Sequence, residues 1–127
     1  MAAIGGSIHS ITIDGREFAV AADADSNRKI GGYENEIQAN GDFTGRLIKT
    51  AVTFMLDGIE IEIDDARGDH QFLQELQDKL DFINISIEYA SGAVWAGTGQ
   101  IVQETQVSSQ KTTASISLSG NGKLQQL

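Results

Sequence analysis

The stretch Asp57-Gly58-Ile59-Glu60-Ile61-Glu62-Ile63-Asp64 decides the fold class of this chain. Its isoleucines alternate with acidic residues, so the apolar side chains share one face and the charged side chains share the opposite face. A period of two is typical of a β-strand with one buried and one exposed face. The Asp57-Gly58 pair that precedes the alternation supplies the positive φ angles of a tight turn, which predicts a hairpin at this point.

Runs of the same kind extend outward over most of the chain. They predict strands at residues 8–13, 16–22, 34–39, 43–56, 59–64, 83–89, 93–105 and 112–119. The turns are marked by Asp14-Gly15, Asn40-Gly41, Asp57-Gly58 and Ser91-Gly92. About eight strands with short connections indicate a mainly β fold, an antiparallel β-sandwich or β-barrel.

One segment breaks this period. Between residues 69 and 80, Phe72, Leu73, Leu76 and Leu80 recur at the spacing of one helical face. Asp69 is the expected N-cap, because its carboxylate can accept the free amide donors of the first turn. The sequence therefore predicts one α-helix, at about residues 69–80, flanking the strands.

The length of 127 residues fits a single domain that covers residues 1–127. Its ends, residues 1–6 and 121–127, are expected to be flexible. The sequence has no cysteine, which excludes disulfides and thiolate metal sites, and no proline, so every residue keeps a backbone donor for a sheet. A signal peptide and a membrane-spanning segment are not recognisable, so we expect a soluble protein made in the cytosol.

The charge is strongly acidic, with nine basic residues against 18 acidic ones and a formal net charge of -9. Proteins that grip nucleic acid neutralise phosphates with lysine and arginine. This composition therefore argues against a groove that holds nucleic acid, and it suits a surface to which DNA does not adhere.

Catalysis has little support in the sequence. His9 falls in a predicted strand and His70 at the start of the predicted helix, with no serine–base or cysteine–base arrangement around them. Two acidic pairs could in principle supply a catalytic acid and base, but we interpret them as the solvated face of a strand. These pairs are Glu60/Glu62 and Asp64/Asp65. We expect no enzyme activity, no catalytic residue and no cofactor.

A calcium loop is suggested by oxygen-bearing side chains at every second position from Asp23 through Asp25 to Asn27. Glu34 stands twelfth, where a bidentate ligand of such a loop would lie. Arg28, however, replaces the glycine that the sharp turn requires, and no helix is predicted on either side. The expectation is a polar loop without a metal site.

Glycines inside a predicted strand carry two alternative interpretations. Gly97 and Gly99 indicate a bulge or bend, or else a close approach of another backbone, such as that of a neighbouring subunit. Neither these nor the other glycines form a phosphate-binding loop.

The order of these elements resembles the tail tube proteins of Mu-like and related contractile-tailed phages. The resemblance covers nearly the whole chain, from Ile8 to Lys123, and it rests on order, spacing and short total length. The segments that carry it are Ile11-Thr12-Ile13-Asp14-Gly15, Ile30-Gly31-Gly32-Tyr33-Glu34, the helix from Phe72 to Leu80, Tyr89-Ala90-Ser91-Gly92 and Ala114-Ser115-Ile116-Ser117-Leu118-Ser119-Gly120.

This resemblance implies a structural virion protein that forms hexameric rings. The rings stack into the inner tail tube, which is the conduit for DNA ejection and is surrounded by the sheath. Its implied partners are copies of itself, the tail sheath, the tape measure and baseplate proteins, with DNA passing through the lumen without specific binding. The implied location is the virion tail, assembled in the host cytoplasm. Two alternatives remain: the ring protein of a type VI secretion tube, and a calcium- or ligand-binding β-module.

Two features gain an expected role within such a tube. The polar segment 23–32 and the hairpin around Asn40-Gly41 are expected to reach an adjacent ring. Carboxylates that face a narrow lumen would repel DNA phosphates over a screening length of about 8–10 Å. The candidates are Glu34, Glu36, Glu60, Glu62, Asp64 and Glu88.

Overall fold

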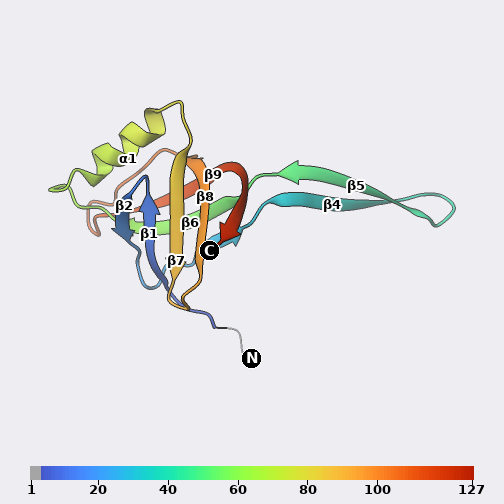
Figure 1. Cartoon of the computed structure of the whole chain (residues 1–127), viewed down its shortest axis with the longest axis horizontal. Helices are drawn as coiled ribbons and strands as arrows, with labels where there is room; N and C mark the ends of the chain where they lie inside the picture. The colour runs from blue at the N-terminus through green and yellow to red at the C-terminus, as the bar shows by residue number, and fades with distance from the viewer. Residues whose placement is uncertain (1–3) are drawn as a thin grey trace.

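The computed structural model describes residues 4–127 and is built around one curled antiparallel sheet, with a two-stranded arm that extends from it (Figure 1). The sheet has the strand order β2-β1-β7-β8-β9-β6-β3. Its strands are β1 Ile8–Ile13, β2 Arg16–Ala19, β3 Asn27–Lys29, β6 Met55–Glu62, β7 Ile83–Tyr89, β8 Val94–Ile101 and β9 Thr113–Gln126. The arm consists of β4 (Gly32–Ala39) and β5 (Gly45–Val52), and the helix is α1 (Asp69–Asp78).

The curl brings the two ends of the sheet towards each other. Figure 1 shows β1 and β7 in front and β6 crossing behind them. Val20 forms a single bridge with Ile61, and the amide of Ala21 donates to the carbonyl of Glu60 over 3.0 Å. Because only this short contact links β2 to β6, a sandwich describes the molecule and a closed barrel does not. The predicted mainly β fold is confirmed.

Strand β9 turns the corner between the two layers. Its first half pairs with β6 and its second half with β8. At the corner, Gly99 and Gly120 lie so close that a Cβ on either would collide with the partner backbone. The close approach predicted for Gly97 and Gly99 is therefore made by this chain's own residues: Gly99 meets the β9 backbone, while Gly97 faces the side chains of Phe54 and Leu124.

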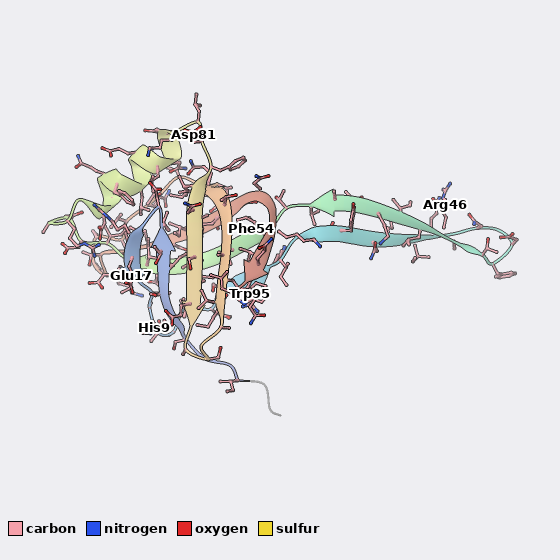
Figure 2. The ribbon with its side chains drawn as sticks, in the orientation of Figure 1. His9, Glu17, Arg46, Phe54, Asp81 and Trp95 are labelled. Carbon is pink, nitrogen blue, oxygen red and sulfur yellow. The ribbon has the colours of Figure 1, made fainter. Side chains whose placement is uncertain are left out.

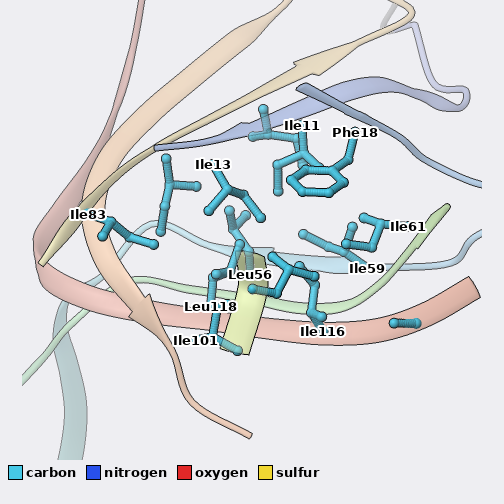
Figure 3. Packing of buried hydrophobic residues seen from close by; sticks show 14 of the residues in the cluster. Ile11, Ile13, Phe18, Leu56, Ile59, Ile61, Ile83, Ile101, Ile116 and Leu118 are labelled. Atoms are coloured by element: carbon cyan, nitrogen blue, oxygen red, sulfur yellow. The ribbon is translucent and has the colours of Figure 1, made fainter. Parts of the chain in front are cut away.

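The interior of the curled sheet holds the hydrophobic core (Figure 3). In the deciding stretch, Ile59, Ile61 and Ile63 are buried, while Glu62 and Asp64 are exposed, which confirms the period of two. Every strand of the sheet except the short β3 contributes to this core. Its most deeply buried large side chains are Phe18, Phe54, Ile11, Ile13, Leu56, Ile59, Ile61, Leu73, Leu76, Ile85, Ile87 and Ile116.

Helix α1 lies where the sequence predicts it, but both of its ends differ. The residue at its N-cap is Gly68, with φ 73°, and not Asp69. The buried carboxylate of Asp69 instead accepts the amide of Asp64 over 3.0 Å and the guanidinium of Arg16 over 3.1 Å, so it ties the helix start to the sheet. At the other end the helix stops at Asp78, and Leu80 is fully exposed beyond it.

Two of the predicted turns have different outcomes. Asp14 and Gly15, with φ 50° and 85°, connect β1 to β2 in a two-residue hairpin, as predicted. Asp57 and Gly58 do not form a turn, because they lie inside β6 and produce a bulge in its pairing with β9. The predicted strand 43–56 is accordingly wrong in extent, since it divides into β5 and the start of β6.

The C-terminal end is ordered, contrary to the expectation for residues 121–127. Strand β9 continues to Gln126, which pairs with Trp95, and Leu124 is buried in the core. At the other end, residues 4–6 lie outside any strand, and residues 1–3 of that expectation fall outside the described residues. Within residues 4–127, no helix is long and apolar enough to cross a membrane.

Candidate functional site: the exposed arm

The arm formed by β4 and β5 is the outward continuation of a strand pair in the body. Strands β3 and β6 pair with Asn27 opposite Asp57. Strands β4 and β5 keep the same register, with Gly32 opposite Val52 and Ala39 opposite Gly45. Figure 1 shows that this continuation leaves the body and projects into solvent as a long two-stranded ribbon.

The last part of strand β9 is hydrogen-bonded to the base of the arm, at the point where the arm leaves the body. The amide of Phe54 donates to the carbonyl of Gly122 over 3.0 Å, and the amide of Leu124 donates to the carbonyl of Ile30 over 3.0 Å. Gly31 lies at this crossing with φ 94°, and a Cβ there would stand 2.8 Å from the backbone nitrogen of Phe54. The base of the arm is therefore fixed by backbone contacts, with Phe54 buried at the junction (Figure 2).

One face of the arm is largely apolar and exposed. Residues that pair directly across a hairpin point to the same side, so Tyr33 shares a face with Ala51, and Ile37 with Leu47. The exposed fractions of Tyr33, Ile37 and Leu47 are 65%, 67% and 53%. Lys49 lies in the middle of this face, with its ammonium 5.5 Å from the Tyr33 ring centre.

The opposite face of the arm is mostly polar. Glu34 pairs with Thr50 there, and the side-chain oxygen of Gln38 accepts a hydrogen bond from the guanidinium of Arg46. The two faces therefore differ in the way that a half-buried strand pair requires, although both are exposed in the single chain.

The tip of the arm is a loop of residues 40–44 that holds an aromatic side chain in solvent. The amide of Asn40 donates to the carbonyl of Thr44 over 2.8 Å, so the loop closes on itself. Phe43 is fully exposed and has φ 70°, an uncommon backbone conformation for a bulky residue. Hydrogen bonds from the hydroxyl and the amide of Thr44 hold the pKa of the Asp42 carboxyl below its usual value.

An arm of this kind has little stability of its own. A two-stranded hairpin without further packing is marginally stable in water. Each arm strand pairs with the other alone, so among residues 4–127 the outer edges of β4 and β5 are both unpaired. Unpaired edges and an exposed apolar face are the features by which strands join another chain. The arrangement fits a contact with a partner surface.

The sequence-predicted catalytic candidates do not gather into a site. His9 lies at the end of β1 that is remote from α1, the helix that carries His70 (Figure 2). Glu60 accepts the hydroxyl of Thr113 over 2.8 Å, and Asp64 accepts the amide of Ala66 over 2.9 Å. Both of these acidic side chains thus have structural hydrogen bonds.

The calcium-loop pattern is spread over separate elements. Asp23 and Asp25 precede β3, whereas Glu34 lies on the polar face of the arm. Because β3 is extended and paired with β6, the chain does not fold back to bring these oxygens together. In the part of the chain that the structure describes, no three acidic or histidine side chains form a group that could hold a metal ion.

The structure also shows where the segment 23–32 and two of the predicted lumen carboxylates lie. Residues Asn27–Lys29 belong to the body as β3, so this segment is not a free connector, whereas the hairpin around Asn40-Gly41 does project. Glu60 lies on the outward face of β6 and Glu88 on that of β7. These strands lie in different layers of the curled sheet, with β6 crossing behind β7 (Figure 1).

Comparison of the chain with models of known protein families finds no match, and comparison with curated proteins finds none either. The description of this protein is therefore based on its fold and on the arm. Together they define a mainly β domain with an exposed hairpin that has one largely apolar face and one mostly polar face.

Proposed function

We propose that this chain is the ring-forming subunit of the inner tube of a contractile phage-type tail. Six copies close into a ring, and rings stack into a tube within the sheath, between the tape measure and baseplate partners. The observation that carries the proposal is the arm, whose apolar face and two strand edges are open to solvent in the single chain. The proposed location is the virion tail.

The arm supports assembly from copies of this chain through simple geometry. It projects from one side of the body, so an arm that docks on another copy makes a contact between two different surfaces (Figure 1). Contacts of this kind either close into rings or continue as filaments. A stacked tube uses both outcomes, because lateral contacts close and axial contacts remain open.

The net charge of -9 supports the conduit role. Carboxylates on the lumen wall repel phosphates, so DNA passes without being held. Only one wall of the body faces the bore. Either the group on β6, with Glu60 and Glu62, or Glu88 on β7 contributes to it.

Paired substitutions on the two faces of the arm test this proposal. Ile37→Asp places a charge on the apolar face, and Gln38→Asp places the same charge one residue away on the polar face. Both positions are exposed, so neither change should alter the melting temperature of the monomer. We expect the Ile37 variant to lose rings and tubes in negative-stain images at concentrations where the wild type and the Gln38 variant form them.

A wild-type protein that stays monomeric at every concentration, and in the presence of a baseplate nucleus, would contradict the proposal. Equal assembly by the Ile37 and Gln38 variants would show that the arm's apolar face is not the contact. Light scattering after size-exclusion chromatography gives the ring number directly.

A further inference from the structure

A hollow of about 600 Å³ lies on the body, where the N-terminal segment, β3 and the β7–β8 hairpin meet. Arg28, Tyr89 and Trp95 line it together with Ile4 and with residues that are small or polar, and Figure 2 shows Trp95 on the body near the base of the arm. None of the residues that line this hollow is acidic. The charged side chain in this lining is that of Arg28, which favours a ligand that carries a negative charge.

Arg28 is held in place by aromatic rings and not by an acidic partner. Its guanidinium carbon stands 4.4 Å from the ring centre of Trp95 and 4.9 Å from that of Tyr89. Among residues 4–127, no carboxylate lies within 4.0 Å of the Arg28 guanidinium. The stacking orders a long side chain without using its N–H donors, which remain available for a bidentate carboxylate.

The tip of the arm presents the complementary groups side by side. Asp42 presents a carboxylate whose Oδ1 accepts hydrogen bonds from the amide and the hydroxyl of Thr44, and the neighbouring Phe43 is an aromatic ring that is fully exposed. The loop of residues 40–44 is closed by its own hydrogen bonds, which place Asp42 and Phe43 next to each other at the tip.

We propose that the hollow around Arg28 is the receptor for the arm tip of a second copy of this chain. The carboxylate of Asp42 pairs with the guanidinium of Arg28, and the Phe43 ring packs against Tyr89 and Trp95. This inference rests on the proposed self-assembly and specifies which surface receives the arm. It also explains how two acidic copies meet, because the contact matches an acidic tip to a hollow with no acidic side chain.

Another anionic ligand is less consistent with the same surface. A nucleic-acid phosphate would also suit Arg28, but a single arginine in a chain of net charge -9 gives little attraction for a polyanion. The combination of one cation with two aromatic rings matches a short segment that carries one carboxylate and one ring.

A charge exchange between the two sites tests this contact in the full chain. Asp42→Arg and Arg28→Asp each place like charges at the contact, so we expect each to raise the concentration needed for assembly by about tenfold or more. The double variant restores the pair in reversed order and should assemble near the wild-type concentration. Lys29→Asp is the matched control, because Lys29 neighbours Arg28 in β3 but does not line the hollow. Circular dichroism of each monomer verifies folding.

Trp95 provides an independent readout, since it is the single tryptophan of the chain. Its fluorescence should change on assembly of the wild type and of the double variant, and it should not change on mixing the monomer with a short single-stranded DNA or with inorganic phosphate. Single variants that assemble normally, a double variant without rescue, or a response to DNA or phosphate would each overturn the proposal. A wild type that assembles while the exchange fails leaves the proposed function intact, whereas a wild type that never assembles removes both.

Discussion

The body and the arm share the same alternation of apolar and polar residues, but the apolar side chains are buried in the body and exposed in the arm. Ile61 on β6 and Ile37 on β4 both alternate with polar residues and pair in antiparallel ladders. Ile61 is fully buried, whereas Ile37 is 67% exposed. The difference lies in what covers the strand pair, because the body curls over its own apolar face and the arm projects beyond anything that could cover it (Figure 1).

This difference separates the residues that fold the chain from those available to join it to others. Burial of an isoleucine stabilises a domain by about 1.5–3 kcal/mol relative to leaving it exposed. The body obtains this stabilisation inside one chain. The arm can obtain it only when another surface covers Ile37 and Leu47, and in the proposed assembly that surface belongs to another copy of the chain.

The largest expected effect comes from matched substitutions of the two isoleucines. Ile61→Ala should reduce the free energy of unfolding by about 2–5 kcal/mol, since it leaves a cavity in the core. Ile37→Ala should change it by less than about 0.5 kcal/mol, because the site is exposed. Urea unfolding of the monomers measures both. Similar losses for both variants would mean that the arm folds against the body in solution.

The sequence predicts the body well because its signals are local. The period of two over residues 59–64, the Asp14-Gly15 turn and the burial of Leu73 and Leu76 on α1 each depend on neighbours in the chain, and each is confirmed. The misassigned features depend on distant parts of the chain. Asp57-Gly58 forms a bulge because β9 pairs with β6 on both sides of it. The Asp69 carboxylate does not cap the helix, because it accepts hydrogen bonds from the Asp64 amide and the Arg16 guanidinium instead.

The candidate site was only partly visible in the sequence. The strand at 34–39 and the turn at Asn40-Gly41 follow from the residue pattern, whereas the predicted strand 43–56 runs past the end of β5 at Val52. The projection of the arm from the body does not follow from the pattern. The alternation of apolar and polar residues along a strand is the same whether the apolar face is covered by protein or exposed to solvent. The hollow was missed altogether, since Arg28, Tyr89 and Trp95 come from three strands and only the curl of the sheet brings them together.

A smaller effect is expected at the junction of helix and sheet, where Asp69 links the start of α1 to Asp64 and Arg16. Asp69→Ala removes the acceptor used by the Asp64 amide and the Arg16 guanidinium, and should lower the free energy of unfolding by about 1–3 kcal/mol. Asp65→Ala removes an exposed carboxylate four residues earlier in the chain; it is the control and should stay within about 0.5 kcal/mol. Thermal melts of both monomers provide the measurement, and an equal loss in both would contradict the role assigned to Asp69.

Hydrogen–deuterium exchange of the arm, before and after assembly, tests the central claim most directly. In the monomer, the amides of Gly32–Ala39 and Gly45–Val52 should exchange quickly compared with those of β6 and β7, because the unsupported hairpin opens readily. In assembled particles the same amides should become protected while the body amides change little. Arm amides that are as protected as the core in the monomer, or that stay unprotected in the assembled particle, would contradict the account.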